Sequence, residues 1–438
     1  MHRFSLFEVI RWLGLLLFFG CVPLDQATTT VSSGSNYSKK LVLDNQVYEE
    51  SIKTVRLYPM QDVYDEVIQP AIIPIQSSRN LVLEFDQLYG DFQSYYARLI
   101  HCDGNWEKSR LNNTDFLLEF NDFPITDYQY SFGTRMPYIH YRWIVPRVKR
   151  TGNYVIKVYR QGNEADLILT RRFMVYDNRI QINAVVGMSD GIVERDFNQQ
   201  LNFSIQYPEL EIQNPLEEIN VVIRQNKRWD NALYNLPPTT LKPDIKTIEY
   251  RYFNLENNFQ GGNEFRFFDL RSINILGQNI ASIDRKENRV DAFILKDELN
   301  IHRGHGTYDD INGEYVIDNL ETDPPDITSE YVFVHFFLES PPMSEAVFIL
   351  GALSDWKCDD ANLMTYDTQL NGYTKTLMLK QGWYNYLYYM PESEDPYHYE
   401  GSYFETENLY EILVYYRPVG AFADQLIGYN NIIHNRRP

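Results

Sequence analysis

The side chains whose types and spacing come closest to a chemical site are two histidines, His302 and His305, followed by the carboxylates Asp309 and Asp310. Two histidines three residues apart with a carboxylate nearby could hold a divalent metal ion. The glycines on either side of His305 make this segment a loop, however, which lacks the helix or strand geometry that sets ligand positions. A solvated loop is the preferred interpretation, and the sequence predicts no metal site and no bound cofactor.

Catalytic machinery has no recognisable signature in this chain. An enzyme needs a nucleophile, a base and an orienting group that converge in space. The sequence contains no Gly-x-Ser-x-Gly elbow, no phosphate-cradling glycine loop and no His-Glu-x-x-His motif. Pairs of carboxylates occur in any acidic protein, so without a recognisable spacing they do not indicate a glycosidase. We therefore predict that the protein is not an enzyme and has no catalytic residues.

Aromatic residues near the C-terminus offer a different chemistry, the stacking of rings on a ligand or a partner. A buried strand from Val347 leads into Gly351-x4-Trp356, and a turn at Gly382 leads into alternating tyrosines. This order resembles the early-set immunoglobulin-like sandwiches of carbohydrate-binding modules, and the resemblance implies a binding module with a tryptophan platform. The later loop that should supply a second ring holds tyrosines and no tryptophan. A tryptophan in the core or at its rim is therefore the preferred interpretation of Trp356.

Tyrosines alternate along the strand after Gly382, with Tyr388 on one face and Tyr389 on the other. A sandwich strand hides only one face, so some rings should stay exposed, and exposed aromatic rings are enriched in protein interfaces. Trp383 falls within the turn and is not an evident second platform. The possible stacking or interface aromatics are therefore Trp356, Trp383, Tyr388 and Tyr389. A contact between domains of this chain would use them equally well.

The elements that must position these residues are β-strands. The chain has 438 residues, of which 44% are hydrophobic and 15% aromatic, with 34 tyrosines, and aromatic residues favour half-buried pleated surfaces. Apolar and polar residues alternate with a period of two along much of the chain, which indicates strands, and no long amphipathic helix is found. We predict an all-β fold of three consecutive immunoglobulin-like β-sandwich domains, at residues 45–178, 179–325 and 326–438.

Several strands and one linker can be assigned from the pattern. Leu81, Leu83 and Phe85 share one strand face, and Tyr331–Leu338 is apolar on both faces, which is typical of a central strand. The segment Asp323–Asp326 contains two prolines, which fix φ and cannot join a central ladder, so it is predicted to be a stiff linker between domains. Further alternating runs are Ile139–Val145, Tyr154–Val158, Leu201–Tyr207 and Ile219–Ile223.

The first 21 residues are interpreted as a secretory signal peptide. Arg3 and Arg11 accompany an apolar run, Trp12–Phe19, that is far shorter than the ~20 residues of a membrane span. The run ends at Gly20-Cys21, and both lipoprotein-type cleavage with acylation of Cys21 and ordinary cleavage further downstream remain open. Residues 22–44 are expected to form a flexible leader.

Charge and cysteine content limit the partners and the compartment. The formal net charge of −20 argues against nucleic acid, because lysine and arginine must neutralise phosphates there. Cys102 and Cys358 fall in different predicted domains, so two buried free thiols are expected, with a disulfide between them as the alternative.

Extended motifs in one order along the chain resemble the plug protein of the type IX secretion system. The resemblance runs from about Tyr58 to Tyr429, nearly the whole mature chain. The matching segments are Val55–Pro59, Tyr96–Trp106, Phe116–Tyr130, Ser131–Thr134, Pro137–Tyr141, Thr151–Tyr154, Lys157–Tyr159, Gly401–Asn408, Tyr415–Pro418 and Gln425–Tyr429.

This resemblance implies a non-enzymatic plug in the periplasm, associated with the outer membrane. It would dock on the large outer-membrane β-barrel translocon and occlude its periplasmic mouth until a cargo complex displaces it. No catalytic or cofactor residue is implied, and the membrane would be touched only through the partner or through a lipid on Cys21. The alternatives are a secreted or surface glycan-binding protein that uses the C-terminal sandwich, and a structural lipoprotein without a gating role.

Overall fold

The computed structural model describes residues 39–60, 68–300, 304–306 and 308–436, all within one compact unit. Almost all of its regular structure is strand, which confirms the all-β fold class. The helical pieces of this part of the chain are α2 (Asn113–Phe116), α3 (Pro215–Glu218), α4 (Pro325–Thr328), η2 (Pro243–Ile245) and η3 (Ala352–Ser354). None of the described helices has the length and apolar character needed to cross a membrane.

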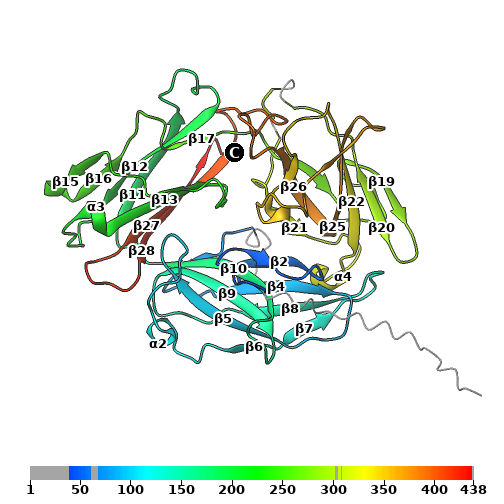
Figure 1. The fold of residues 1–438 in the computed structure, drawn as a ribbon, viewed down its shortest axis with the longest axis horizontal. Helices are drawn as coiled ribbons and strands as arrows, with labels where there is room; N and C mark the ends of the chain where they lie inside the picture. The colour runs from blue at the N-terminus through cyan, green and yellow to red at the C-terminus, as the bar shows by residue number, and fades with distance from the viewer. Residues whose placement is uncertain (1–38, 61–67, 301–303, 307, 437–438) are drawn as a thin grey trace, which may run out of the picture. The chain divides into compact units, whose positions relative to one another are not determined.

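The first sandwich consists of two sheets around one core (Figure 1). One sheet has the order β1-β10-β9-β5-β6 with β3 beside β10, and the other has the order β2-β4-β8-β7. Leu81, Leu83 and Phe85 contribute to the core from β4, as the alternation predicts. The bounds are β1 (Gln46–Val47), β2 (Ile52–Pro59), β3 (Ile72–Pro74), β4 (Leu81–Leu88), β5 (Tyr95–Cys102), β6 (Phe123–Ile125), β7 (Asp127–Tyr130), β8 (Tyr138–Ile144), β9 (Gly152–Arg160) and β10 (Leu167–Tyr176).

The second sandwich has one sheet ordered β11-β12-β16-β15, with β17 beside β12, and another ordered β14-β13-β27-β28. Leu201 and Phe203 from β12 meet Val221 and Ile223 from β13 in its core. The bounds are β11 (Gln181–Met188), β12 (Asn198–Gln206), β13 (Ile219–Gln225), β14 (Leu233–Tyr234), β15 (Thr240–Lys242), β16 (Thr247–Tyr250), β17 (Asn258–Gln260), β27 (Asn408–Tyr416) and β28 (Gln425–His434).

The third sandwich has one sheet ordered β18-β26-β21, with β23 beside β26, and another ordered β19-β20-β22-β25-β24. The strand predicted to be central, at Tyr331–Leu338, is β22, which has a neighbour on each side. The bounds are β18 (Arg266–Asp269), β19 (Ile280–Arg285), β20 (Val290–Ile294), β21 (Tyr315–Ile317), β22 (Tyr331–Glu339), β23 (Phe348–Leu350), β24 (Thr365–Asp367), β25 (Gly372–Lys380) and β26 (Gly382–Tyr389).

The sheets correct the predicted boundary at residue 325. β27 and β28, from the end of the chain, complete the second sandwich beside β13 (Figure 1), and Val221 of β13 pairs with Val414 of β27. The third sandwich takes β18 to β21, which precede residue 325. Asp323–Asp326 therefore connects two strands of one sandwich and is not a linker between domains. Alternation marks a strand but not its partner, and β13 finds its partner far away in the sequence.

Candidate functional site: the junctions between the sandwiches

The outer face of β4, which points away from the core of the first sandwich, carries acidic side chains. Alternation along the strand predicts that this face is exposed to solvent, but the third sandwich covers it. Asp86 Oδ2 accepts hydrogen bonds from Lys380 Nζ at 2.6 Å and from the Tyr331 hydroxyl at 2.6 Å. The side chains of Asp86 and Lys380 are each 1% exposed. Burial raises the pKa of Asp86, but Lys380 and His140 outweigh this effect and the pKa is lowered. Burial lowers the pKa of Lys380, and its contact with Asp86 opposes this effect. A buried ion pair thus lies between the first and third sandwiches.

Tyr138 and Glu330 extend this junction. The Tyr138 ring centroid lies 4.2 Å from Lys380 Nζ, and its ring meets Tyr331 edge-on at 5.3 Å. The Tyr138 hydroxyl donates to the Ser329 carbonyl at 3.0 Å. The Glu330 carboxylate accepts two backbone N–H groups just before β8, at 2.6 and 3.1 Å. The charged network thus has hydrogen-bonding partners on both sides of the junction.

A second polar group lies beside this network. Glu84, His140 and Asp326 line a pocket of ≈ 180 Å³, and one potential ligand atom from each lies within 4.8 Å of the other two. His140 Nδ1 is 2.7 Å from Asp86 Oδ1. Arg56 Nη2 lies 2.7 Å from Glu84 and 2.5 Å from Asp326. The group joins β4 and β8 of the first sandwich to α4 of the third.

The junction between the first and second sandwiches has a different composition. The rings of Trp106 and Trp229 meet edge-on at 5.0 Å. The Arg172 guanidinium lies 4.4 Å from the Trp106 centroid and 5.6 Å from the Trp229 centroid. The Arg224 guanidinium lies 4.3 Å from the Trp229 centroid. Cations attract the faces of aromatic rings, most strongly where water is excluded, so this stack of guanidinium and indole groups holds the two sandwiches together.

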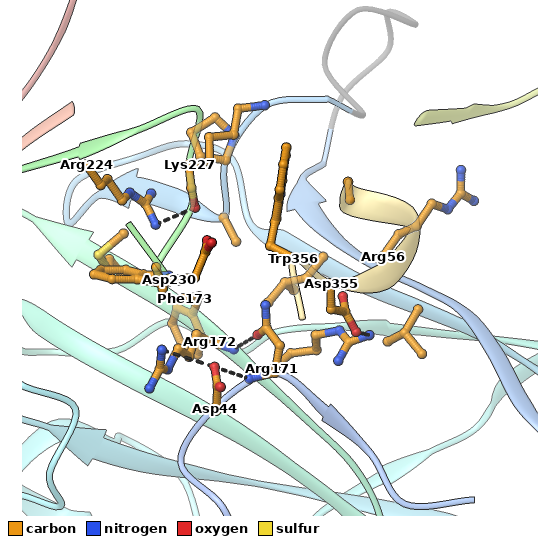
Figure 2. A pocket seen from close by; sticks show the side chains of 18 of the residues that line it. Asp44, Arg56, Arg171, Arg172, Phe173, Arg224, Lys227, Asp230, Asp355 and Trp356 are labelled. Carbon is orange, nitrogen blue, oxygen red and sulfur yellow. Dashed lines mark hydrogen bonds and ion pairs between the residues drawn. The ribbon is translucent and has the colours of Figure 1, made fainter. Parts of the chain in front are cut away.

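A cavity of ≈ 460 Å³ borders all three sandwiches, and cations and acids line it (Figure 2). The described lining residues include no histidine, serine, threonine or cysteine. Two of its ion pairs cross from one sandwich to another, which gives the lining a role in joining them. The crossing pairs are Arg171–Asp355 at 3.0 Å (Figure 2) and Lys227–Glu314 at 2.9 Å, and Arg172–Asp44 at 3.0 Å lies within the first sandwich.

Trp356 lies at this cavity and is half-buried. The Arg228 guanidinium lies 4.8 Å from its ring centroid, and Phe265 meets the ring edge-on at 5.7 Å. Gly313 has a φ of +81°, and a Cβ there would lie 2.3 Å from Trp356 Cη2, so only glycine fits. Protein side chains therefore take up much of the ring that a glycan would stack on.

The tyrosines of β26 differ from the sequence expectation that some rings stay exposed. Tyr388 is fully buried in the third sandwich, and its hydroxyl donates to Asp297 Oδ2 at 2.7 Å. Tyr389, on the other face, is half-buried: Tyr397 packs against it at 5.3 Å and the Arg228 guanidinium lies 5.4 Å from its centroid. Contacts within the chain, including one from the second sandwich, therefore cover the face that was expected to be open.

Trp383 does not join Trp356 in one site. Its half-buried ring packs on Phe267 with centroids 5.2 Å apart, and the Arg271 guanidinium lies 5.7 Å from its centroid. The structure thus brings Trp356 and Tyr389 to the same arginine, Arg228, and separates Trp383 and Tyr388 from them.

The structure describes only part of the loop that contains His302 and His305. His305 Nε2 lies 3.2 Å from Glu264 Oε1, and His302 lies outside the described residues. Burial raises the pKa of Asp310 to about 7. The group of potential metal ligands that the described residues form lies at His140 instead.

Other expectations concern cysteines and the start of the chain. Cys102 and Cys358 are both free, as the preferred interpretation predicted, but only Cys102 is buried and Cys358 is half-buried. The proposed signal peptide, Cys21 and most of the leader lie outside the described residues.

Sequence reasoning missed the residues of both junctions. Asp86 and Lys380 are 294 positions apart, so no local motif could join them. One signal was present: Glu84 and Asp86 share a strand face with Val82 and Leu88 in LVLEFDQL, and acids that become buried need partners.

Comparison with known proteins supplies the remaining findings. Residues 52–177, which span β2 to β10, match the family described as Type 9 secretion system plug protein 1st domain. A hypothetical protein from Parabacteroides merdae ATCC 43184, known from a crystal structure, has 27% sequence identity and a TM-score of 0.84. The alignment covers 90% of this chain and all of that one, so the similarity extends over all three sandwiches. No curated protein matches.

A solved structure of a Corynebacterium diphtheriae protein described as membrane anchored was also compared. It has 9% identity and a TM-score of 0.12, with 86% of this chain and 91% of that chain covered. It supports no conclusion.

Proposed function

We propose that this protein is a plug of the type 9 secretion system, because residues 52–177 match the first domain of that system's plug protein. It docks on the periplasmic mouth of the outer-membrane translocon barrel of that system and occludes it while no cargo is present. The match of residues 52–177 to the plug first domain carries the proposal. The family is a secretion-system family and not an enzyme family, and the proposed action requires no bond to be made or broken.

Occlusion by contact requires a body that keeps its shape. Domains joined by small polar interfaces move relative to one another by default. Here the Asp86–Lys380 pair, the Trp106–Trp229 contact and the Arg171–Asp355 pair each fix one sandwich against another. These contacts support a plug that moves as one piece and is displaced as a whole.

The proposed place of action is the periplasmic side of the outer membrane. A lipid on Cys21 would add a tether to the membrane, but occlusion depends on contact between the plug and the barrel. Mass spectrometry of the mature amino terminus distinguishes an acylated Cys21 from a chain cleaved further downstream.

Deletion of the gene tests the occlusion. We expect the deletion strain to become sensitive to a glycopeptide antibiotic too large for ordinary porins, because the translocon mouth stays open. A second deletion that removes the translocon barrel should restore resistance, and re-expression of the plug should do the same. Unchanged sensitivity in the single deletion would contradict the proposal and favour a structural lipoprotein.

A further inference from the structure

We propose that Glu84, His140 and Asp326 bind a divalent transition-metal ion of the Zn²⁺ class at the junction of the first and third sandwiches. This site goes beyond the plug function and does not depend on it. The three residues provide one imidazole nitrogen and two carboxylate oxygens, and they line one pocket. An ion held there would tie β4 and β8 to α4.

His140 has the surroundings of a metal-binding histidine, because its ring is buried and a carboxylate contacts one ring nitrogen. The residue is 6% exposed, and its Nδ1 lies 2.7 Å from Asp86 Oδ1. The other Asp86 oxygen accepts hydrogen bonds from Lys380 and Tyr331, so these contacts hold the Asp86 carboxylate in place beside Nδ1. A carboxylate on one ring nitrogen is the usual support of a metal-binding histidine, because it fixes the tautomer and leaves a lone pair on the other.

The second ring nitrogen of His140 lies near the Glu84 carboxylate but beyond hydrogen-bonding distance of it. His140 Nε2 lies 4.0 Å from Glu84 Oε1, too far for a hydrogen bond. Zinc bonds of about 2.0–2.2 Å place neighbouring ligand atoms roughly 3.3–3.6 Å apart. The ligand atoms here lie within 4.8 Å of one another, so the side chains need to close by about 1 Å around the ion.

Each carboxylate keeps an oxygen for the ion. Arg56 Nη2 contacts Oε2 of Glu84 and Oδ1 of Asp326, so Oε1 of Glu84 and Oδ2 of Asp326 are the oxygens that Arg56 does not contact. The pocket volume of ≈ 180 Å³ has room for an ion and several waters. Arg142 Nε lies 3.5 Å from Glu84 Oε1 and must turn away when the ion enters.

The donor set selects the class of ion. Imidazole suits zinc and its first-row neighbours, whereas calcium and magnesium prefer sites made of oxygen alone. The guanidinium groups of Arg56 and Arg142 oppose a cation, so the site binds zinc more weakly than a closed four-ligand structural site.

Isothermal titration of the purified protein with ZnCl₂ tests this site, using protein treated with chelator, dialysed and free of any histidine tag. We expect one ion per chain. The variants His140→Gln and Asp326→Asn should each lower the association constant about tenfold or more. The Asp326 side chain is 37% exposed, so Asp326→Asn remains informative if His140→Gln fails to fold, which circular dichroism reports.

His335→Gln is the matched control. His335 also contacts an aspartate, Asp291, at 2.8 Å, but its second nitrogen lies 2.9 Å from the Thr376 hydroxyl. Among the described residues it belongs to no group of three potential metal ligands. Zinc binding in this variant should stay within about twofold of wild type. Three results would each overturn the site: no binding by the wild type, wild-type binding by both site variants, or an equal loss in His335→Gln.

Discussion

The two junctions of the first sandwich are built from different chemistry. Its contact with the third sandwich centres on the Asp86–Lys380 ion pair, which is fully buried. Its contact with the second centres on Trp106, Trp229 and the Arg172 guanidinium. A buried ion pair is costly to leave half-complete, whereas an aromatic stack weakens gradually. Removing one side chain should therefore cost more stability at the junction with the third sandwich than at the junction with the second.

The largest effect should follow from breaking the ion pair. Lys380→Met leaves the Asp86 carboxylate buried without its cation, and we expect the free energy of unfolding to fall by about 3–5 kcal/mol. Urea denaturation followed by tryptophan fluorescence measures this. The double variant Asp86→Asn/Lys380→Met should be more stable than Lys380→Met alone, because no unpaired charge remains. Simple addition of the two single losses would refute the coupling.

A smaller effect should follow at the aromatic junction. Arg172→Met keeps the aliphatic stem but removes the cation next to both tryptophans, and a loss of about 1–2 kcal/mol is expected. Its ionic partner Asp44 has a side chain that is 36% exposed and stays hydrated. If Arg172→Met cost as much as Lys380→Met in the same urea experiment, the contrast between the junctions would disappear.

Acid should weaken the ionic junction selectively. The pKa values of Asp86 and Asp326 are both lowered: burial raises each of them, but nearby cations outweigh it, chiefly Lys380 for Asp86 and Arg56 for Asp326. An acid with a lowered folded pKa contributes stability above its unfolded pKa of about 3.9 and loses it as pH falls through the folded value. Wild-type stability should therefore decline below about pH 4.

Urea midpoints at neutral pH and at about pH 3.5 measure this decline. The Asp86→Asn variant should show a smaller drop, because it has one fewer group to protonate, and Arg172→Met should keep the full drop. Equal drops in wild type and Asp86→Asn would show that Asp86 is not the source of the acid sensitivity.

The smallest change in stability is expected at a solvent-exposed contact between a cation and an aromatic ring. Arg251 is exposed, and its guanidinium lies 5.7 Å from the Phe253 centroid. Arg251→Met should change the free energy of unfolding by no more than about 0.5 kcal/mol. A loss equal to that of Arg172→Met would mean that burial does not set the strength of the Arg172 contact.

The sequence predicted strands well and their partners poorly. The apolar faces of Tyr331–Leu338 indicated a central strand, and β22 has that place. Nothing local indicated that β27 would pair with β13, because period-two alternation is the same whichever strand lies alongside. The domain boundary at residue 325 was wrong for that reason.

The junction residues escaped prediction for a related reason. Leu81, Leu83 and Phe85 share the core face of their strand, as alternation predicted, and Glu84 and Asp86 lie on the opposite face. What the pattern omits is that the third sandwich covers this outer face and turns solvated acids into buried ones. Trp356 stood out because its position after Gly351 resembles that of a stacking tryptophan in carbohydrate-binding modules, but its neighbours Arg228 and Phe265 come from distant segments. The aromatic pattern alone could not distinguish a glycan platform from an internal contact.

The most direct test of the plug function is to capture the protein from envelopes extracted with a gentle detergent and to identify its partners by mass spectrometry. The proposal predicts a very large outer-membrane β-barrel that co-purifies with it and is not released by oligosaccharides. Repeated recovery of the protein without such a barrel would contradict the proposal.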